Sequence, residues 1–391
     1  MTDNPIRDII MIGYHPWKTF EDQGFRTRPG HLVETMSRTS QVGKVLYVPP
    51  ADQPGLLRKY PPVLAGPWWE VYAPLPRVWA VDFRPGVPVD LDAPALVTAI
   101  ARKLDFSDPV LWLSSPLATP YIRRVGERLV VFDAVDNWLE HLQFRGAKEQ
   151  VAQGYQTIRE QADVIFTVST GLAKILSGCR GQVHWIPNGV DVDFLQAAAR
   201  TEPPDLLGLR RPLLGYVGVI QERVDTGLLG YLATQMPHAT IVLVGPVQEA
   251  IRQALARYPN IRFLGLRHYL KVPGYIKRFD VCLLPHFVNS LTESMDPIKL
   301  YEYLALGKPV VATRVAGAKR LQELIYLAQT PKEFYVRVLQ ALQESPGPAL
   351  RRIRAARSQG WQQRVNLMLS CLERVRRNAL SQGIEGQPPL P

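Results

Sequence analysis

The sequence predicts an α/β protein built from two doubly wound domains, each with its own parallel sheet. Short apolar segments of strand length alternate with segments of helical periodicity in two successive series, which begin at 9–13 and 213–218. An aperiodic stretch that contains prolines, 197–212, separates the two series. Because strands alternating with helices are typical of βαβ units, each series is expected to form a parallel sheet.

The two series divide the chain into four predicted parts. A Rossmann-like N-terminal domain spans 1–196, a linker spans 197–212, and a second Rossmann-like domain spans 213–345. The last part, 346–391, is expected to be a basic helix with a tail, and to pack back toward the N-terminal domain.

Composition limits the class of protein. Hydrophobic residues make up 46% and charged residues 21% of the 391-residue chain, as in a globular protein with ample core material. No apolar stretch approaches the length of a transmembrane helix, and the start of the chain lacks the apolar segment of a signal peptide. The three cysteines are far apart, which fits a reducing compartment. A cytoplasmic protein is therefore expected.

The sequence offers no convincing metal site. The cysteines lack the CxxC spacing of zinc and iron–sulfur sites. The D-x-D pair Asp191 and Asp193 could hold a metal bound to a diphosphate, but it follows an Asn-Gly turn and suits a helix cap better. Asp90 and Asp92 are no stronger a candidate. No metal and no cofactor are predicted.

Much of the formal net charge of +11 lies near the C-terminus. Residues 351–377 contain eight arginines and one acid, Glu373, with apolar residues at helical spacing. One interpretation is a helix packed on the body of the protein with a solvated basic face. The other is attraction to anionic lipid headgroups or to an anionic acceptor, which would place the protein peripherally at the inner membrane face. No recognised module for nucleic acid accompanies the charge.

The first series has the order of a doubly wound sheet. Its strands are expected at 9–13, 44–48, 110–114, 129–133, 163–168 and 183–186, and its helices at 31–37, 155–162 and 170–176. Residues 50–90, rich in proline and tryptophan, are expected to form an irregular insertion with short strands.

Polar residues follow two strands of this series. Ligands of doubly wound sheets bind at the carboxyl ends of strands. The long loop after 9–13 carries His15, Arg26 and Arg28, and Asp133 and Asp136 stand at the end of a later strand. We predict His15 and the two acids as catalytic candidates and the two arginines as binding groups. A plain surface loop and a helix cap are the alternative interpretations.

The second series contains the stretch that organises the chain. Its strands are expected at 213–218, 239–245, 261–265, 280–285 and 310–313, and its helices at 228–236, 247–258, 272–278 and 297–306. Asp296 is expected to cap the last helix, and Pro297 suits its first position. Gly307 is expected to end that helix as its C′ residue.

Lys299 is unusual because a cation in the first helical turn opposes the helix dipole. A phosphate or diphosphate at this helix start would remove the conflict, since free backbone N–H groups and a lysine form a good anion site. Glu302, one turn further on, could then accept hydrogen bonds from a ribose. The alternative interpretation is a solvated Lys–Glu pair on an ordinary helix.

Three stretches carry a resemblance to a known family. They are Pro-Asn-Gly-Val-Asp at 187–191, Ala-Asp-Val-Ile-Phe-Thr-Val-Ser at 162–169, and the long motif Asp-Pro-Ile-Lys-Leu-Tyr-Glu-Tyr-Leu-Ala-Leu-Gly-Lys-Pro-Val-Val at 296–311. With them the chain resembles the GT-B-fold, retaining, nucleotide-sugar-dependent glycosyltransferases of family 4 and its group 1 relatives. The resemblance covers about residues 8–345 and implies two Rossmann-like domains that face a central cleft, with the acceptor bound by the first domain.

The resemblance implies a donor site in the second domain. Glu302 would bind the donor ribose, and Lys299 with the helix start at Ile298 and Leu300 would bind the diphosphate. The other donor-binding residues that it implies are Gly218, Glu222, Arg223, Asp225, Asn289, Thr292 and Asp296.

The chain departs from the family pattern at three places. Ser294 stands where the family often has a first glutamate, eight residues before Glu302. Val219 replaces the arginine that usually follows the glycine at 218, for which Arg223 is a possible substitute. The histidine usual in the first domain is missing, which a retaining front-face mechanism tolerates because the donor phosphate itself takes the acceptor proton.

The expected function is therefore transfer of a sugar from a nucleoside-diphosphate sugar to an acceptor hydroxyl, with retention. The expected acceptor is a glycan or a lipid-linked molecule in polysaccharide or glycolipid synthesis. A nucleotide-sugar epimerase and a non-catalytic polyanion-binding scaffold are the alternatives.

Overall fold

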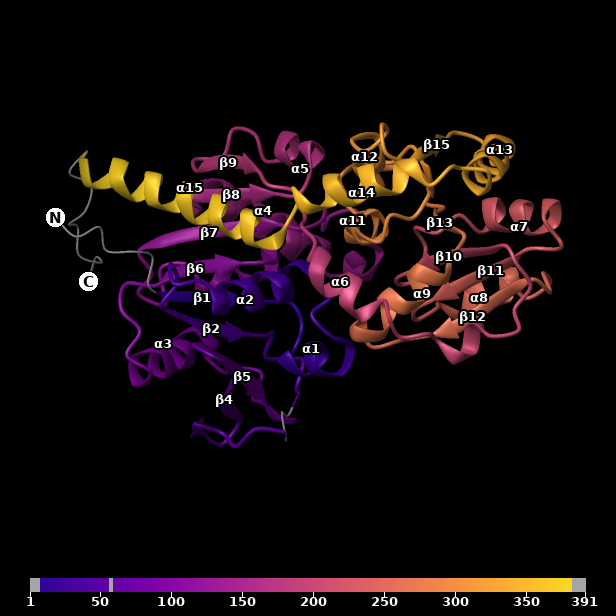
Figure 1. Cartoon of the computed structure of the whole chain (residues 1–391). Coiled ribbons are helices and arrows are strands. Elements are labelled where there is room, and N and C mark those ends of the chain that lie inside the picture. Colours follow the sequence, from indigo (N-terminus) through magenta and orange to yellow (C-terminus); the bar gives the residue numbers. More distant parts are fainter. Residues whose placement is uncertain (1–7, 56–58, 382–391) are drawn as a thin grey trace. The chain divides into compact units, whose positions relative to one another are not determined.

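The computed structural model describes residues 8–55 and 59–381, with the chain folded into two compact units (Figure 1). Unit 1 comprises 1–186 and 362–391, and unit 2 comprises 187–361. The predicted parts at both ends therefore extend, at 1–7 and 382–391, outside the described residues. No described helix combines the length and the apolar character needed to cross a membrane.

Unit 1 is built on a nine-stranded sheet in the order β3-β4-β5-β2-β1-β6-β7-β8-β9. The strands are β1 (Asp8–Ile12), β2 (Lys44–Val48), β3 (Leu64–Ala65), β4 (Trp69–Leu75), β5 (Val78–Phe83), β6 (Val110–Leu113), β7 (Leu129–Ala134), β8 (Val164–Thr167) and β9 (Gln182–Trp185). From β5 to β9 every pairing is parallel, and β3 and β4 extend the sheet antiparallel. The apolar runs of β1, β6 and β7 are wholly buried, as expected of strands covered on both faces.

Two segments of unit 1 are more regular than predicted. The insertion at 50–90 contains the hairpin β4–β5, whose second strand pairs with β2 and so continues the main sheet. The predicted loop after β1 contains a helix, α1 (Trp17–Gln23), because Trp17 and Phe20 lie on one face and are buried together. The helices of unit 1 are α1, α2 (Arg28–Arg38), α3 (Ala93–Lys103), α4 (Lys148–Gln161), α5 (Thr170–Ile175) and α15 (Trp361–Ser381), with short 3₁₀ turns η1 (Pro116–Tyr121) and η2 (Leu142–Ala147).

Unit 2 has a six-stranded parallel sheet in the order β12-β11-β10-β13-β14-β15. Its strands are β10 (Leu213–Val217), β11 (Thr240–Val244), β12 (Ile261–Gly265), β13 (Val281–Leu284), β14 (Val310–Thr313) and β15 (Tyr326–Ala328). In chain order this is 3-2-1-4-5-6, the doubly wound arrangement in which the strand order reverses between β10 and β13. The predicted fold class is confirmed.

Six α-helices of unit 2 lie between these strands in the chain, one precedes the first strand and two follow the last. The helices are α6 (Val192–Ala198), α7 (Thr226–Gln235), α8 (Glu249–Leu255), α9 (Val272–Arg278), α10 (Ser290–Glu293), α11 (Ile298–Ala305), α12 (Ala316–Lys319), α13 (Pro331–Leu342) and α14 (Gly347–Arg357), with 3₁₀ turns η3 (Pro204–Leu206) and η4 (Tyr269–Lys271). A right-handed crossover after each parallel strand requires such a connection.

The segment predicted as a linker belongs to unit 2. Asp205 within it accepts hydrogen bonds from Arg267 at 2.7 Å and from the Tyr275 hydroxyl at 2.9 Å. Upstream of it, α6 packs against α11 and α9. Side-chain contacts therefore hold the segment 197–212 against the rest of unit 2. Its composition of prolines and polar residues does not predict these contacts.

The predicted basic C-terminal part is divided between the two units. Helix α14 packs on α11 in unit 2, whereas α15 belongs to unit 1 from Gln362 onward. The apolar stripe of α15 is buried at Val365, Met368 and Leu372, as its spacing predicts. Arg352 is an exception to the solvated basic face, because it is buried and bonds Glu344 through both carboxylate oxygens at 2.6 Å.

Candidate active site

The loops at the carboxyl edge of the unit 2 sheet are joined to one another. Strands β10 and β13 are parallel neighbours, so the loops that follow them meet. Val224 and His286 form an antiparallel bridge, and the Phe287 amide donates to the Arg223 carbonyl at 2.9 Å. The loop that carries the predicted cation Arg223 is thus held by the loop that follows β13.

Helix α11 begins one residue later than predicted. Its N-cap is Pro297, so the prediction that Asp296 caps the helix is wrong. The Asp296 carboxylate instead accepts from the Asn188 amide at 2.7 Å and from the Tyr301 hydroxyl at 2.8 Å, and it pairs with Arg320. Asp296 is buried in these contacts, so it fixes the helix start against the 187–189 turn.

The predicted end of α11 is confirmed. Gly307 has a φ of 68°, in the left-handed region that favours glycine. Its amide bonds the Leu304 carbonyl at 2.9 Å, and the Lys308 amide bonds the Tyr303 carbonyl at 3.0 Å. This pair of bonds is the Schellman motif.

Lys299 projects from α11 toward the end of β10. Its Nζ lies 3.0 Å from the Tyr216 hydroxyl and 4.6 Å from the centre of the Tyr216 ring. A Cβ added to Gly218 would lie 2.7 Å from the same Nζ, so a side chain at position 218 would displace the ammonium from this place. A cation is therefore held at a strand end, where ligands of doubly wound sheets bind.

Glu302 lies one turn further along α11 and is only 5% exposed. The solvated Lys–Glu pair on an ordinary helix is excluded by this burial. Burial raises the pKa of the Glu302 carboxyl above its ordinary value, against the opposing effects of a hydrogen bond with Tyr269 and the charge of Lys299.

The other predicted donor-binding residues of the loop after Gly218 have partners within the protein. Glu222 accepts from the Gln248 side chain at 3.0 Å. Asp225 caps α7 by accepting from the Leu228 amide at 2.8 Å. Arg223 is half-buried, and its guanidinium lies 3.6 Å from the Met295 sulfur.

Asn289 and Thr292 form the capping box of the short helix α10. The Thr292 amide donates to the Asn289 side chain at 3.0 Å, and the Asn289 amide donates to the Thr292 hydroxyl at 3.0 Å. The Ser294 hydroxyl donates to the Leu291 carbonyl, and Glu293 pairs with Lys319 at 2.9 Å. Glu293, one residue before the position where the family often has an acid, is thus paired with a lysine of the protein.

The carboxyl edge of the unit 1 sheet holds a buried ion pair. Arg28 Nε lies 2.9 and 3.0 Å from the two carboxylate oxygens of Asp133, and these side chains are 2% and 0% exposed. Beside them, burial and the negative charges of Asp136 and Asp133 raise the pKa of the Tyr14 hydroxyl. Two residues predicted for separate roles, acceptor binding and catalysis, are thus bonded to each other.

His15 is a neutral imidazole near neutral pH. Burial, followed by the positive charge of Arg26, lowers its pKa to about 4. Its ring lies edge-on to Tyr14, with the ring centres 4.6 Å apart. Asp136 is half-buried at the end of β7 and accepts from the Asn137 amide at 3.0 Å.

The D-x-D acids are used structurally. Asp191 caps α6 by accepting from the Phe194 amide at 2.9 Å, as its position after the turn predicts, and Asp193 pairs with Arg357 at 2.8 Å. Among the described residues no cluster of three acids, histidines or cysteines has the geometry to hold a metal ion.

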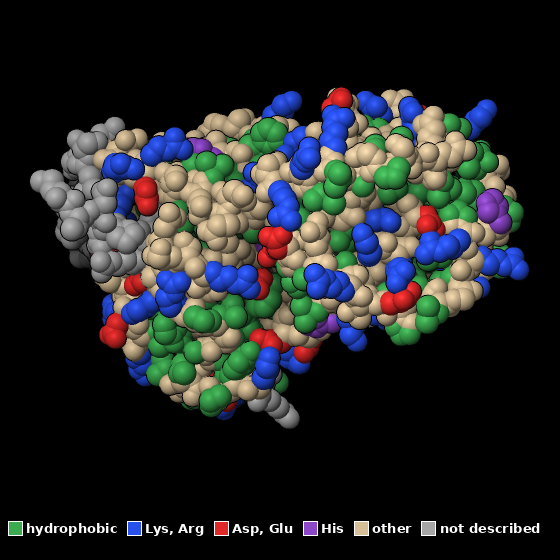
Figure 2. All heavy atoms as spheres, in the orientation of Figure 1, with side chains coloured by type: hydrophobic (Ala, Val, Ile, Leu, Met, Phe, Trp, Pro, Cys, Tyr) green, Lys and Arg blue, Asp and Glu red, His purple; other side chains and the backbone are tan. Residues whose placement is uncertain are grey.

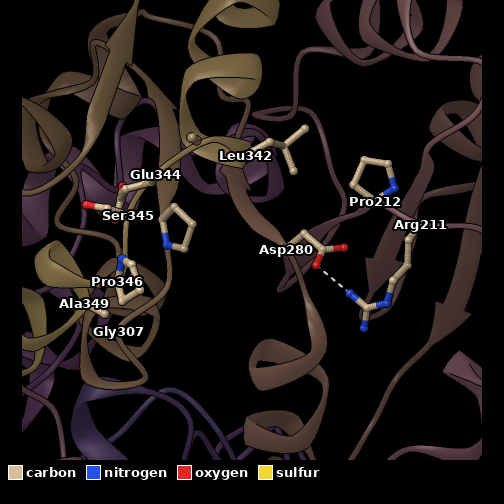
Figure 3. Close-up of a pocket in the computed structure, with 11 residues that line it drawn as sticks. Arg211, Pro212, Asp280, Gly307, Leu342, Glu344, Ser345, Pro346 and Ala349 are labelled. Atoms are coloured by element: carbon tan, nitrogen blue, oxygen red, sulfur yellow. Dashed lines mark hydrogen bonds and ion pairs between the residues drawn. The ribbon is translucent and has the colours of Figure 1, made fainter.

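A cavity of about 520 Å³ opens at the opposite edge of the unit 2 sheet (Figure 3). Its lining includes Pro212, Asp280 and Pro309, which precede β10, β13 and β14, so it lies at the amino ends of the strands. Asp280 is bonded there to Arg211. The cavity is therefore separate from the edge that holds Lys299.

Sequence reasoning missed several residues that shape the site. Tyr216 and His286 contact the Lys299 environment, and Asn188, Tyr301 and Arg320 contact Asp296. His286 could have been found, because it directly follows the strand predicted at 280–285. The others lie within strands, helices or distant turns, where no local pattern distinguishes them from core residues.

Comparison with known proteins gives three kinds of match. Residues 211–344 match the family model described as glycosyl transferases group 1. A Bacillus subtilis (strain 168) protein described as a teichuronic acid biosynthesis glycosyltransferase, TuaH, is 29% identical over 210 residues, which are 50% of this chain and 52% of that protein. The chain thus spans about half the length of this curated relative.

Solved structures match across nearly the whole chain. Sucrose-phosphate synthase from Thermosynechococcus elongatus has a TM-score of 0.69 at 16% identity, with 95% of this chain and all of that chain covered. A trehalose-6-phosphate synthase structure, described as giving insight into enzymatic glycosyl transfer with retention, has a TM-score of 0.63 at 13% identity over 94% of this chain and 99% of its own. At these identities the likeness establishes the fold.

Proposed function

We propose that this chain, which has the GT-B fold and belongs to the group 1 glycosyltransferases through its domain at 211–344, transfers a sugar from a nucleoside-diphosphate sugar to an acceptor hydroxyl. The observation that carries the proposal is the position of Lys299. Its ammonium is held beside Gly218 at the carboxyl edge of β10, next to the first turn of α11. A cation and a helix N-terminus together suit the diphosphate of a donor.

Glu302 supports the same site from the next turn. A buried carboxylate there can accept hydrogen bonds from a ribose, and the cost of its burial is offset when such donors arrive. Its hydrogen bond with Tyr269 and the nearby charge of Lys299 leave it partly compensated in the absence of a ligand.

We further propose that transfer occurs with retention, by attack on the same face as the departing diphosphate. In such a reaction the donor phosphate oxygen takes the proton of the acceptor hydroxyl, so no strong protein base is needed. The pairing of Asp133 with Arg28 fits this route, because that carboxylate is already neutralised. The protein then contributes positioning and stabilisation of the diphosphate. A retaining reaction is named for one structural neighbour, the trehalose-6-phosphate synthase.

The proposed acceptor is a glycan or a lipid-linked molecule, as in the synthesis of a polysaccharide. The teichuronic acid relative supports this class. We propose no metal and no cofactor.

On the face shown in Figure 2, Lys and Arg side chains are spread over the surface among other residues rather than gathered in one patch. Contact with an anionic membrane surface is proposed for the exposed Arg374 and Arg377 of α15.

A donor screen tests the proposal. Nucleotide release from UDP-, GDP- and ADP-sugars should be detected with at least one donor, and Lys299→Ala should lower the affinity for the matching nucleoside diphosphate by about 10- to 100-fold, the value of a charge-assisted contact. Titration calorimetry measures this affinity.

The matched control is Lys332→Ala, since Lys332 is an exposed lysine in the first turn of another helix of the same unit, α13. This variant should bind nucleoside diphosphate as the wild type does. Equal affinities for Lys299→Ala and Lys332→Ala would refute the assigned site, and no binding of any nucleoside diphosphate would refute the function.

A further inference from the structure

The ammonium of Lys299 lies at one end of a series of contacts. The series runs from Tyr216 on β10 through His286, which follows β13, to Thr313 on β14. We propose that Tyr216 and His286 are positioning residues that hold the Lys299 ammonium in place for a diphosphate. The inference rests on the proposed function and deepens it. Neither residue is predicted to touch the donor, so their role is exerted through Lys299.

Tyr216 supplies the direct contact. It lies on β10, wholly buried, and its hydroxyl lies 3.0 Å from Lys299 Nζ. Lysine can only donate in this contact, so the tyrosine oxygen accepts. The single hydrogen of the hydroxyl is then left for the Val219 carbonyl or for His286 Nε2, which lie at 3.2 Å each. The lysine contact thus depends on where that hydrogen is directed.

His286 limits the orientation of the tyrosine. It is 1% exposed, and its backbone is fixed to β14, because its amide donates to the Thr313 hydroxyl at 3.2 Å and its carbonyl accepts from that hydroxyl at 2.7 Å. Its Nδ1 has no hydrogen-bond partner among the described residues. The Tyr216 hydroxyl is therefore the polar group that orients this imidazole ring.

The imidazole adds no positive charge to the site. Burial, then the charges of Lys299 and Arg223, hold the pKa of His286 well below its ordinary value. A neutral ring can accept or donate at Nε2 without repelling the neighbouring ammonium. Lys299 and Arg223 thus remain the positive charges around His286.

This arrangement matters because a lysine side chain is flexible. Four rotatable bonds let an unsupported ammonium spread over many positions, and the entropy of ordering it is lost when the ligand binds. The Tyr216 hydroxyl and ring hold the ammonium in advance at the place over Gly218 that a Cβ would otherwise fill. Pre-organisation of this kind raises affinity for the group that the ammonium contacts, and for no other part of the ligand.

The test compares Tyr216→Phe with the wild type in titrations with UDP, GDP and ADP and with the nucleosides uridine, guanosine and adenosine. The substitution keeps the ring and removes the hydroxyl. We expect about tenfold weaker binding of the preferred nucleoside diphosphate, the value of a hydrogen bond to a charged group, and unchanged binding of its nucleoside. A residue that serves only packing would change both affinities or neither.

A double substitution isolates the coupling. In a Lys299→Ala background, Tyr216→Phe should change the diphosphate affinity by less than twofold, because the group that it positions is gone. The matched control is Tyr303→Phe, which removes a buried hydroxyl bonded to the Val217 amide at 2.9 Å. That variant should lose stability but keep the ratio of diphosphate to nucleoside affinity.

His286 is tested with a pair of substitutions. His286→Gln can keep a polar group near Nε2 and should retain most of the diphosphate affinity, whereas His286→Leu should lower it as Tyr216→Phe does. If the wild type binds a nucleoside diphosphate and Tyr216→Phe binds it equally well, the inference is overturned and the proposed function stands. If the wild type binds none, both are overturned.

Discussion

The carboxyl edges of the two sheets use their positive charges in opposite ways. In unit 1, Arg28 is bonded to Asp133 and both charges are buried. In unit 2, the Lys299 ammonium contacts the Tyr216 hydroxyl and lies close over the backbone of Gly218. A cation paired with a carboxylate serves the fold, whereas a cation held by neutral groups stays available to an anion. The difference suggests that unit 2 supplies the anion site and that unit 1 supplies shape.

The strongest way to break this comparison is to remove the buried cation of unit 1. Arg28→Met leaves the Asp133 carboxylate buried without its partner and should lower the free energy of unfolding by about 3–5 kcal/mol. Urea denaturation measures it. The double variant Arg28→Met with Asp133→Leu should recover most of the loss, because no charge is then left buried. Equal stability of the single and double variants would contradict a structural role for the pair.

Acid should also lower the stability of unit 1, through His15. Its folded-state pKa of about 4 lies below the ordinary value of 6.5, so the unfolded chain binds a proton in this range that the folded chain does not. The stability present above pH 6.5 is therefore lost as the pH falls toward 4, by about 2 kcal/mol at pH 5 for this group alone.

His15→Gln should remove that part of the loss between pH 7.5 and pH 5, as measured by urea denaturation at both values. His31, whose pKa burial lowers to about 3, and His286 of unit 2, whose pKa burial also lowers, contribute in the same direction and leave part of the pH dependence in the variant. An identical pH dependence in the wild type and in His15→Gln would show that His15 is not buried as a neutral ring.

The smallest expected effect tests whether Asp225 belongs to the anion site of unit 2. Asp225 was predicted to bind the donor, but it caps α7. Asp225→Ala should therefore cost about 1 kcal/mol of stability, as a lost N-cap does, and leave nucleoside-diphosphate affinity unchanged. Asp191→Ala, which removes the cap of α6, is the matched control. A fall in affinity for Asp225→Ala alone would return Asp225 to the donor site.

The comparison also explains which site predictions were informative. Lys299 was found because its charge conflicts with a local rule, the preference of the helix dipole for negative charge in the first turn. Asp296 and Asp225 agree with a local rule, that of an N-cap, and one of them caps a helix while the other binds Asn188, Tyr301 and Arg320. A residue that fits a common structural use therefore says little about function, whereas one that violates it says more.

The sequence by itself determined the alternation of strands and helices, the parallel sheets and the end of α11 at Gly307, because periodicity and glycine conformation act over a few neighbouring residues. Only the tertiary structure decided the partners of the charges. Lys299 lies 83 positions from Tyr216, and Arg28 lies 105 positions from Asp133. Such pairs depend on which strands lie near one another in a sheet, here β10 beside β13 for the first pair and β1, β6 and β7 in succession for the second, and no local pattern specifies that order.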